Sequence, residues 1–312
     1  MAPSVAYSAY RLGSLLSRAA PEPVALAFPR VAGTLAARVL QDRRVVVERN
    51  LRRVHGDGFS GTALRRAVDE TFTSYARYWI ESFRLPGLSP TQLDARFTSE
   101  GLEHLDAARA AGTGAILAVP HLGGWEWAAF WLTTVREIPI TAVVEPVEPP
   151  ELYRWFVAFR RSLGMEIVPL GPSAGTDVMR GLREGRVASL LSDRDIGGGG
   201  VEVEFFGERT TLPGGPATLA LRTGVPLLPA AVYFDGPGHC GKVCPPLAVE
   251  RHGRLRDDVT RITQDLAHAL EELIRAAPDQ WHLLQPNWPS DHAALAGSHR
   301  RLGRLCRGAP LA

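Results

Sequence analysis

One short stretch of the sequence combines residue types that can carry out proton transfer. In "AILAVPHLGGWEWAAFW", residues 115–131, an apolar run ends at His121, followed by Gly123, Gly124 and then Glu126 between two tryptophans. A histidine beside a carboxylate is held in one tautomer and can take a proton from a hydroxyl. The glycines permit a tight turn whose backbone N–H groups could hold an oxyanion. We interpret His121 as a candidate general base and Glu126 as its candidate partner.

Further polar side chains follow two other apolar runs. The stretch "RVASLLSDRDI" ends in Asp193, Arg194 and Asp195, and Glu145 comes directly after "TAVV". Any of these acids could instead cap a helix or solvate a loop. Arg160 lies late in a predicted helix, where it could bind a phosphate or complement the helix C-terminus.

A serine motif offers a different chemistry. The stretch "GPSAG", residues 171–175, matches the nucleophile-elbow pattern and lies between a predicted strand and a predicted helix. Ser173 would be the nucleophile of a hydrolase. Its partners would be an acid and a later histidine: Asp193 or Asp195, and His239 or His282.

The cysteines predict neither a disulfide framework nor a metal site. The chain has three, an odd number: Cys240 and Cys244 in "HCGKVC", and Cys306. His239 adds a third metal-binding residue type, but a fourth ligand is missing and the spacing is not that of a zinc motif. We expect residues 239–244 to form a solvent-exposed loop with free thiols, and we expect no bound metal.

The elements that must position these residues alternate between strand and helix. Strands are predicted over residues 114–120, 139–146, 165–170, 186–193, 201–207 and 225–234. Helices are predicted over residues 61–85, 100–112, 150–164, 175–185, 214–224 and 258–278, and after Gly124. Repeated strand–helix–strand units predict an α/β fold with a mostly parallel central sheet flanked by helices. Sites in such sheets form outside the carboxyl ends of the strands, where His121 and Asp193 both lie.

The first part of the chain is predicted to form a helical cap. Residues 1–60 hold nine arginines against four acidic residues, a formal charge of +5, and residues 6–20 and 29–44 space apolar residues at helical intervals. Such helices can lie on an anionic membrane surface, or simply turn their arginines to solvent. We expect residues 1–95 to form a helical membrane-associating segment packed on an α/β core of residues 96–312, in one structural domain overall.

The hydropathy, the N-terminal sequence and the net charge argue against membrane-spanning, exported and nucleic-acid-binding proteins. No apolar run reaches the roughly 20 residues of a membrane-spanning helix, and the N-terminus lacks a signal-peptide layout. The net charge of +2 is too small to indicate a nucleic-acid binder. We expect a peripheral protein at the cytoplasmic face of the cell membrane.

A set of motifs spread over nearly the whole chain resembles one protein family. These motifs are "SYARYWIESFRLP" (74–86), "PHLGGWEWA" (120–128), "LYRWFVAFRRSLGMEIVPL" (152–170), "SDRDI" (192–196) with "VEVEFFGERTTLPGGPATLA" (201–220), and "WHLLQPNW" (281–288). The chain resembles the bacterial lipid acyltransferases that include the lipid A lauroyl and myristoyl transferases, whose hallmark is a histidine, four residues and then Asp or Glu. Within this group, its resemblance is closer to the actinobacterial phosphatidylinositol mannoside acyltransferases.

The resemblance implies roles for particular residues. His121 would activate a sugar hydroxyl, and Glu126 matches a carboxylate that is usually aspartate in the mannoside enzymes. Asp193 matches a position where those enzymes carry a glutamate paired with the histidine. We hypothesise that the longer arm at 126 and the shorter arm at 193 compensate for each other. Three residues match polar positions that line the family's active-site groove: Glu145, Arg160 and Arg194.

The resemblance also implies an activity. The protein would move a long-chain, palmitoyl-like acyl group from acyl-CoA to a sugar hydroxyl of a membrane glycolipid, with His121 as the general base. The expected acceptor is phosphatidylinositol mannoside. Its partners would be acyl-CoA as co-substrate, the glycolipid acceptor and an anionic membrane surface, with no cofactor and no nucleic acid. Two alternatives are a lipid esterase that uses Ser173 and a lipid-binding protein without catalysis.

Overall fold

A seven-stranded sheet forms the centre of the protein. The computed structural model describes residues 4–296, so Cys306 lies outside the described residues. The strand order is β1-β9-β8-β2-β5-β3-β4, and every neighbouring pair is parallel except β8 and β9. The strands are β1 (Phe97–Glu100), β2 (Ala115–Val119), β3 (Ile140–Val144), β4 (Glu166–Pro169), β5 (Val187–Leu191), β8 (Leu227–Asp235) and β9 (Gly238–Val243). The predicted α/β fold with a mostly parallel sheet is confirmed.

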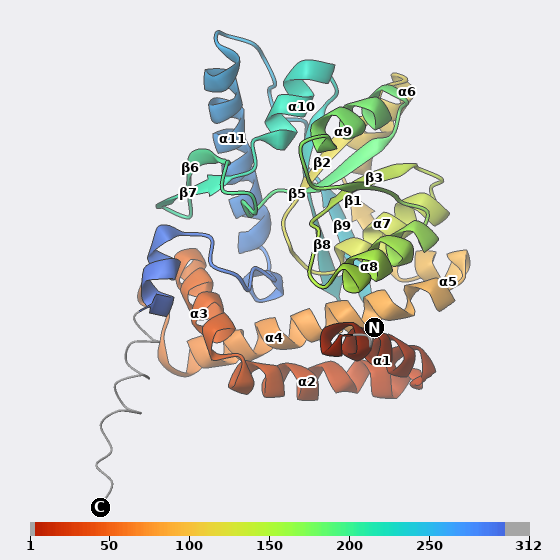
Figure 1. The fold of residues 1–312 in the computed structure, drawn as a ribbon, viewed down its shortest axis with the longest axis vertical. Helices are drawn as coiled ribbons and strands as arrows, with labels where there is room; N and C mark the ends of the chain where they lie inside the picture. Colours follow the sequence, from red (N-terminus) through yellow and green to blue (C-terminus); the bar gives the residue numbers. More distant parts are fainter. Residues whose placement is uncertain (1–3, 297–312) are drawn as a thin grey trace, which may run out of the picture.

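Helices cover both faces of this sheet (Figure 1). One face packs against α6 (Leu102–Ala110), α7 (Trp125–Thr134) and α8 (Pro150–Ser162), and the other against α9 (Ala174–Arg183), α10 (Gly215–Thr223) and α11 (Leu255–Arg275). Strand β2 is therefore buried at every position. Its alternating side chains enter two different cores, with Leu117 and Val119 on the α7 side and Ile116 and Ala118 on the α11 side.

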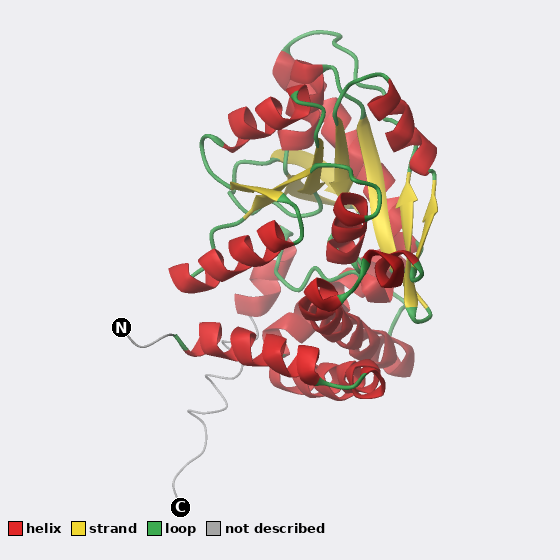
Figure 2. Cartoon of the chain, turned by 90° about the vertical axis from the view of Figure 1, so that its right-hand side faces the viewer, coloured by secondary structure: helices red, strands yellow, loops and turns green. Residues whose placement is uncertain are grey.

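A layer of N-terminal helices lies beneath the sheet, at the bottom of Figures 1 and 2. It consists of α1 (Val5–Ala19), α2 (Glu22–Val39), α3 (Gln41–His55) and α4 (Gly61–Arg84), followed by a short turn, η1 (Leu85–Gly87), and α5 (Pro90–Asp94). Helix α4 lies between α2 and the sheet (Figure 1). The expected helical N-terminal part is present.

The helical stretch expected over residues 29–44 is broken at Leu40. Helices α2 and α3 meet there at 102°. The bend lets α3 leave the plane of α2 and reach the C-terminal part of the chain. Among the described residues, no single helix has the length and apolar character needed to cross a membrane, although α2 and α3 taken together pass on length and composition alone.

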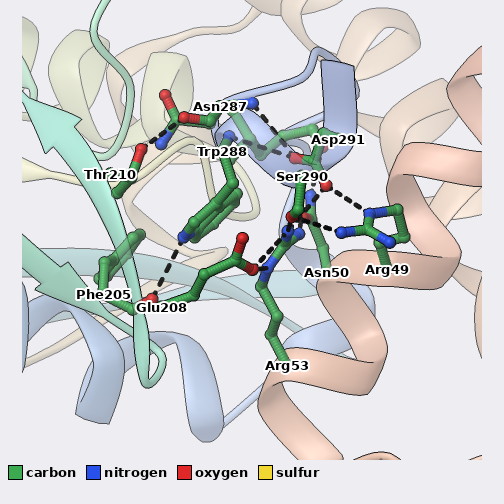
Figure 3. A network of polar contacts seen from close by, with 11 residues as sticks. Arg49, Asn50, Arg53, Phe205, Glu208, Thr210, Asn287, Trp288, Ser290 and Asp291 are labelled. Carbon is green, nitrogen blue, oxygen red and sulfur yellow. Dashed lines mark hydrogen bonds and ion pairs between the residues drawn. The ribbon is translucent and has the colours of Figure 1, made fainter. Parts of the chain in front are cut away.

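The end of the described chain ties the helical layer to the core. Arg49 and Arg53 of α3 both bind Asp291 Oδ1, at 2.6 and 2.7 Å, and Asp291 is fully buried (Figure 3). The Arg53 guanidinium also stacks over the Trp288 ring, 3.9 Å from its centroid. Trp288 in turn packs on Phe205 of a separate two-stranded hairpin, β6 (Val201–Phe205) and β7 (Glu208–Leu212). The helical layer and the core thus share a buried polar network.

Three strands were not expected from the sequence, and one of them corrects a prediction. Residues 238–243 form β9 rather than the expected solvent loop, and His239 within it is buried. The His239 ring stacks on Trp127, and its Nε2 lies 2.9 Å from Glu81 Oε2. Cys240 and Cys244 are free thiols, as expected, but half-buried. The pattern was missed because β9 contains two glycines and a lysine, and takes its shape from pairing with β8 and β1.

Candidate active site

Strand register brings His121 and Asp193 together. In the parallel pair of β2 and β5, Val119 lies opposite Leu191, and each candidate follows its strand end by two residues. The backbone N–H of Ser192 donates to the Val119 carbonyl at 2.9 Å, which extends the pairing past the strand ends. The expected meeting of these two residues at the carboxyl edge of the sheet is therefore found.

His121 and Asp193 form a close hydrogen-bonded pair. The ring Nδ1 of His121 lies 2.6 Å from Asp193 Oδ1, and the backbone N–H of His121 donates to Asp193 Oδ2 at 3.0 Å. An ionised carboxylate only accepts hydrogen bonds, so Nδ1 carries the ring proton and Nε2 is left as the basic nitrogen. The His121 side chain is 20% exposed and that of Asp193 is fully buried, so the imidazole ring has access to solvent while the carboxylate has none.

The surroundings keep Asp193 ionised. Burial by itself would raise the pKa of this carboxyl, but the adjacent His121 and the hydrogen bonds from His121 and Trp281 outweigh it and lower the pKa. A second histidine, His282, donates its backbone N–H to the His121 carbonyl at 2.7 Å. Burial, followed by repulsion from His121, lowers the pKa of the His282 ring to about 3, so that this ring stays neutral.

Glu126 has different partners from those expected. Its Oε1 accepts from Arg160 Nε at 2.7 Å and from the Tyr78 hydroxyl at 3.3 Å, and a second Arg160 nitrogen completes the ion pair. Burial alone would lower the pKa of Arg160, but the Glu126 charge outweighs it and raises that pKa. Burial, followed by the Glu126 charge, raises the pKa of Tyr78. Glu126 thus joins the first turn of α7 to α8 and α4, and Asp193 is the carboxylate that binds the His121 ring.

The two glycines allow close packing at this turn. Gly123 has a positive φ of 57°, and a Cβ there would lie 2.0 Å from the Val232 carbonyl oxygen. A Cβ on Gly124 would lie 2.4 Å from the His239 ring. The Gly123 N–H donates to the Gln280 carbonyl at 3.0 Å, so it is not the oxyanion donor that the sequence suggested. Gly124 is the glycine of the pair that remains a candidate for that role.

The other predicted polar residues lie at the same sheet edge. Glu145 follows β3 and is half-buried, and Arg194 follows Asp193 and is half-buried as well. The Asp195 carboxylate accepts hydrogen bonds from the backbone N–H groups of residues 197, 198 and 200 and from the Thr211 hydroxyl. Asp195 therefore shapes the glycine-rich loop next to Arg194.

An apolar cavity shares one lining residue, Trp125, with the surroundings of His121. The Trp125 ring lies edge-on to the His121 ring, with centroids 5.6 Å apart, and Trp125 also lines the cavity. The cavity continues between the sheet and helices α6 and α7. Its other lining residues include Leu117, Val119, Ala128, Ala129, Trp131 and Phe97. The small side chains of Ala128 and Ala129 leave space that a larger residue would fill.

The geometry does not support the serine-hydrolase alternative. Ser173 is exposed and has ordinary right-handed backbone angles, φ −86° and ψ −13°, rather than a strained elbow. The two histidines proposed as its base contact other groups, since His239 lies against Glu81 and His282 Nε2 lies 2.8 Å from the Ser74 hydroxyl. Within residues 4–296, no cluster of three or more His, Cys, Asp and Glu side chains could hold a metal ion.

Sequence reasoning missed two residues that support Asp193. The Trp281 indole N–H donates to Asp193 Oδ2 at 2.8 Å, and the Asn287 side chain donates to the Asp193 carbonyl at 3.3 Å. Both belong to the "WHLLQPNW" stretch, almost 90 residues farther along the chain. That stretch contributed to the family resemblance, but its contacts depend on the tertiary fold.

The chain is similar in sequence to known lipid acyltransferases. Residues 3–290 match the family of bacterial lipid A biosynthesis acyltransferases. The chain is 44% identical over 223 residues to a phosphatidylinositol mannoside acyltransferase of Mycobacterium tuberculosis strain H37Rv. The aligned region covers 70% of this chain and 69% of the relative. It is 39% identical over 285 residues to the protein of that name from Mycolicibacterium smegmatis, covering 90% and 91% of the two chains.

A more distant relative carries the name of the wider family. The chain is 25% identical over 221 residues to a lipid A biosynthesis acyltransferase of Haemophilus influenzae. The aligned region covers 69% of this chain and 66% of the relative. The resemblance inferred from the sequence motifs is confirmed, and the chain belongs to the bacterial lipid A biosynthesis acyltransferase family.

Proposed function

We propose that this member of the family transfers a long-chain fatty acyl group from acyl-CoA to a sugar hydroxyl of a membrane glycolipid. The names of the mycobacterial relatives favour phosphatidylinositol mannoside as the acceptor. The proposed acyl group is palmitoyl-like, so palmitoyl-CoA is the expected donor. No cofactor is required, because the thioester already activates the acyl group.

One observation carries the proposal: Trp125 contacts both the His121 ring and the apolar cavity. In this proposal the acyl chain lies in that cavity and its thioester carbonyl lies on the His121 side of Trp125, within reach of the basic Nε2. A base and an apolar binding site that meet at one residue are what acyl transfer to an alcohol requires.

The reaction follows from these positions. His121 Nε2 removes the proton of the acceptor hydroxyl while its oxygen attacks the thioester carbonyl carbon. The C–S bond of the tetrahedral intermediate then breaks, and the imidazolium gives the proton that it took from the hydroxyl to the departing CoA thiolate. The products are the acylated sugar and CoA. Asp193 keeps the ring in the correct tautomer and stabilises its charged form.

The polar groups at the edge of the sheet have supporting roles in this proposal. The oxyanion of the intermediate would be stabilised by the Gly124 N–H or by the Arg194 guanidinium. Glu145 would accept hydrogen bonds from the sugar. Arg160 would act through Glu126, because its guanidinium is paired with that carboxylate.

The N-terminal helices support a location on a membrane surface, and we propose that this surface is the cytoplasmic face. Helix α2 buries small residues at a spacing of four: Ala25, Pro29, Gly33 and Ala37. It exposes large apolar ones instead, including Val31, Leu35 and Val39, each at least 60% exposed. A helix of a soluble protein would have the reverse arrangement. Exposed arginines on the same helices, Arg30 and Arg38 among them, suit an anionic lipid surface.

Product analysis tests the proposed function. The protein is incubated with radiolabelled palmitoyl-CoA and vesicles that contain phosphatidylinositol mannoside, and the lipids are separated. We expect the label in the glycolipid fraction. Label found only as free fatty acid would favour the hydrolase, and lipid binding without any product would favour a carrier protein. Either of these results would contradict the proposal.

A further inference from the structure

The carboxylate of Asp193 depends on hydrogen bonds from three donors. Its side chain is fully buried, so the protein must supply all of the hydrogen bonds that water would otherwise give. Oδ1 accepts a hydrogen bond from His121 Nδ1–H, and Oδ2 accepts one from the His121 backbone N–H. Trp281 Nε1 donates the third bond, to Oδ2 at 2.8 Å. Two of the donors belong to His121 itself, so Trp281 is the one that holds the carboxylate independently of the base.

Trp281 is suited to hold the carboxylate in one state. An indole N–H can only donate, so it stabilises the ionised, accepting form of Asp193. The last torsion of an aspartate side chain is broad, and a donor fixed on Oδ2 keeps Oδ1 directed at the His121 ring. The bond thereby favours the arrangement in which Nδ1 carries the proton and Nε2 acts as the base.

The Trp281 ring is itself held rigidly. It is 3% exposed and packs against the rings of Phe206 and Trp288. Its backbone forms an antiparallel bridge with Leu122, the residue after His121. The flanking bonds, from Gly123 N–H to the Gln280 carbonyl and from His282 N–H to the His121 carbonyl, fix the two segments side by side.

We propose that Trp281 is a positioning residue of the acyl transfer, which acts through Asp193 on His121. The inference rests on the proposed function of His121 as the base. Trp281 contacts neither substrate in this proposal. It sets the orientation and ionisation of the group that orients the base, so its loss should slow the chemical step and leave acyl-CoA binding unchanged.

The chain offers a matched control for the test. Trp288 is a buried tryptophan of the same C-terminal stretch, and its indole N–H donates to the Phe205 carbonyl at 3.3 Å, as Figure 3 shows. Trp281→Phe and Trp288→Phe each remove one indole N–H and keep an aromatic ring. Only Trp281→Phe removes a bond to Asp193.

The first measurement is steady-state kinetics of both variants with palmitoyl-CoA. A hydrogen bond to a buried charge is worth about a 10- to 100-fold change in rate if it is lost in the transition state. We expect kcat of Trp281→Phe to fall by about that factor, with KM for palmitoyl-CoA within about twofold of wild type. Trp288→Phe keeps an aromatic ring against Trp281 and leaves the Trp281 N–H in place, so it should keep the wild-type kcat. Equal kcat values for the two variants would overturn the inference.

The second measurement does not need turnover. Proton NMR of the purified protein follows the ring proton that His121 shares with Asp193, assigned by its disappearance in Asp193→Ala. We expect this signal to shift or broaden in Trp281→Phe and to stay in place in Trp288→Phe. An unchanged signal in Trp281→Phe would overturn the inference. Wild-type protein without transfer activity would instead overturn the proposed function, and the NMR comparison would still decide the role of Trp281.

Discussion

At the scale of single residues, the central question was which carboxylate serves His121. The sequence left both Glu126 and Asp193 as possible partners, because Glu126 lies five residues after His121, Asp193 follows another strand, and both depart from the family's usual residue. The structure separates them, since Asp193 binds the ring and Glu126 binds Arg160 and Tyr78. The strand register that brings Asp193 to His121 could not be read from either segment alone. The idea that the two changes in arm length compensate stays a hypothesis.

The buried His282 predicts a pH dependence of stability. Burial lowers the pKa of its ring to about 3 from an ordinary value of 6.5. Between these pH values the unfolded chain binds a proton that the fold excludes, so the free energy of unfolding decreases as the pH falls. One such group contributes at most about 1.4 kcal/mol per pH unit. Urea titrations at several pH values between 6 and 4 give the unfolding free energy at each pH. In His282→Gln this free energy should decrease less steeply as the pH falls, because the contribution of the His282 ring is gone.

The control for this prediction is an exposed histidine. His268 lies on the exposed face of α11, so His268→Gln should follow the wild-type pH dependence. If His282→Gln and wild type gave parallel curves of unfolding free energy against pH, the assignment of His282 as a neutral buried ring would be wrong.

At the scale of elements, the alternation of strand and helix was readable because β2, β3, β5 and β8 are apolar runs bounded by helical patterns. The strands that the sequence did not reveal have weaker patterns. Strand β1, Phe97–Glu100, has one half-buried residue followed by three exposed ones, and β9 carries two glycines and a lysine. Both lie toward the β1 edge of the sheet and form because a partner strand is available. Local pattern therefore predicted the central strands and failed at this edge.

The contact between α7 and α8 gives a stability prediction. Arg160→Met would leave Glu126, which is 3% exposed, without its cation. Removing one partner of a buried ion pair costs about 3–5 kcal/mol. The neighbouring Arg161 is exposed on the same helix, and Arg161→Met should change stability by less than about 0.5 kcal/mol. Urea unfolding of both variants measures the difference. Equal losses would show that the Glu126–Arg160 pair does not hold these helices together.

The apolar cavity gives a prediction of substrate preference. Ala129 lines it, and Ala129→Leu would fill space that the proposed acyl chain occupies. Each methylene that cannot be buried costs about 0.8 kcal/mol. Competition between palmitoyl-CoA and decanoyl-CoA should therefore shift toward the shorter donor in Ala129→Leu, while Ala129→Ser keeps the wild-type ratio. An unchanged ratio in Ala129→Leu would place the acyl chain elsewhere.

At the scale of the whole molecule, the apolar surface is concentrated on one layer. Among the described residues, ten of the twelve large apolar side chains that are exposed lie between Leu12 and Leu40, on α1 and α2 and at the break that follows. The sequence showed that these helices are amphipathic and basic, but it could not show which face packs on α4. Gly33 marks that face, because a Cβ there would lie 2.5 Å from the Thr73 backbone.

This layer predicts binding to lipid vesicles. The triple variant Val31→Ser, Leu35→Ser and Val39→Ser removes exposed side chains whose full burial is worth about 1.5–3 kcal/mol each. Cosedimentation with vesicles containing anionic phospholipid should weaken by at least about 100-fold. Leu170→Ser, an exposed apolar residue outside this layer, is the control and should bind like wild type. Unimpaired binding of the triple variant would contradict the proposed membrane face.

The transfer activity of His121→Ala measures whether this imidazole is the base of the proposed reaction. A positioned general base contributes about 10²–10⁴ in rate. Transfer of label from palmitoyl-CoA to the glycolipid should therefore fall at least about 100-fold in this variant, with a circular dichroism spectrum and unfolding midpoint close to wild type. A folded His121→Ala protein that kept more than about a tenth of the wild-type kcat would contradict the assignment of His121 as the base.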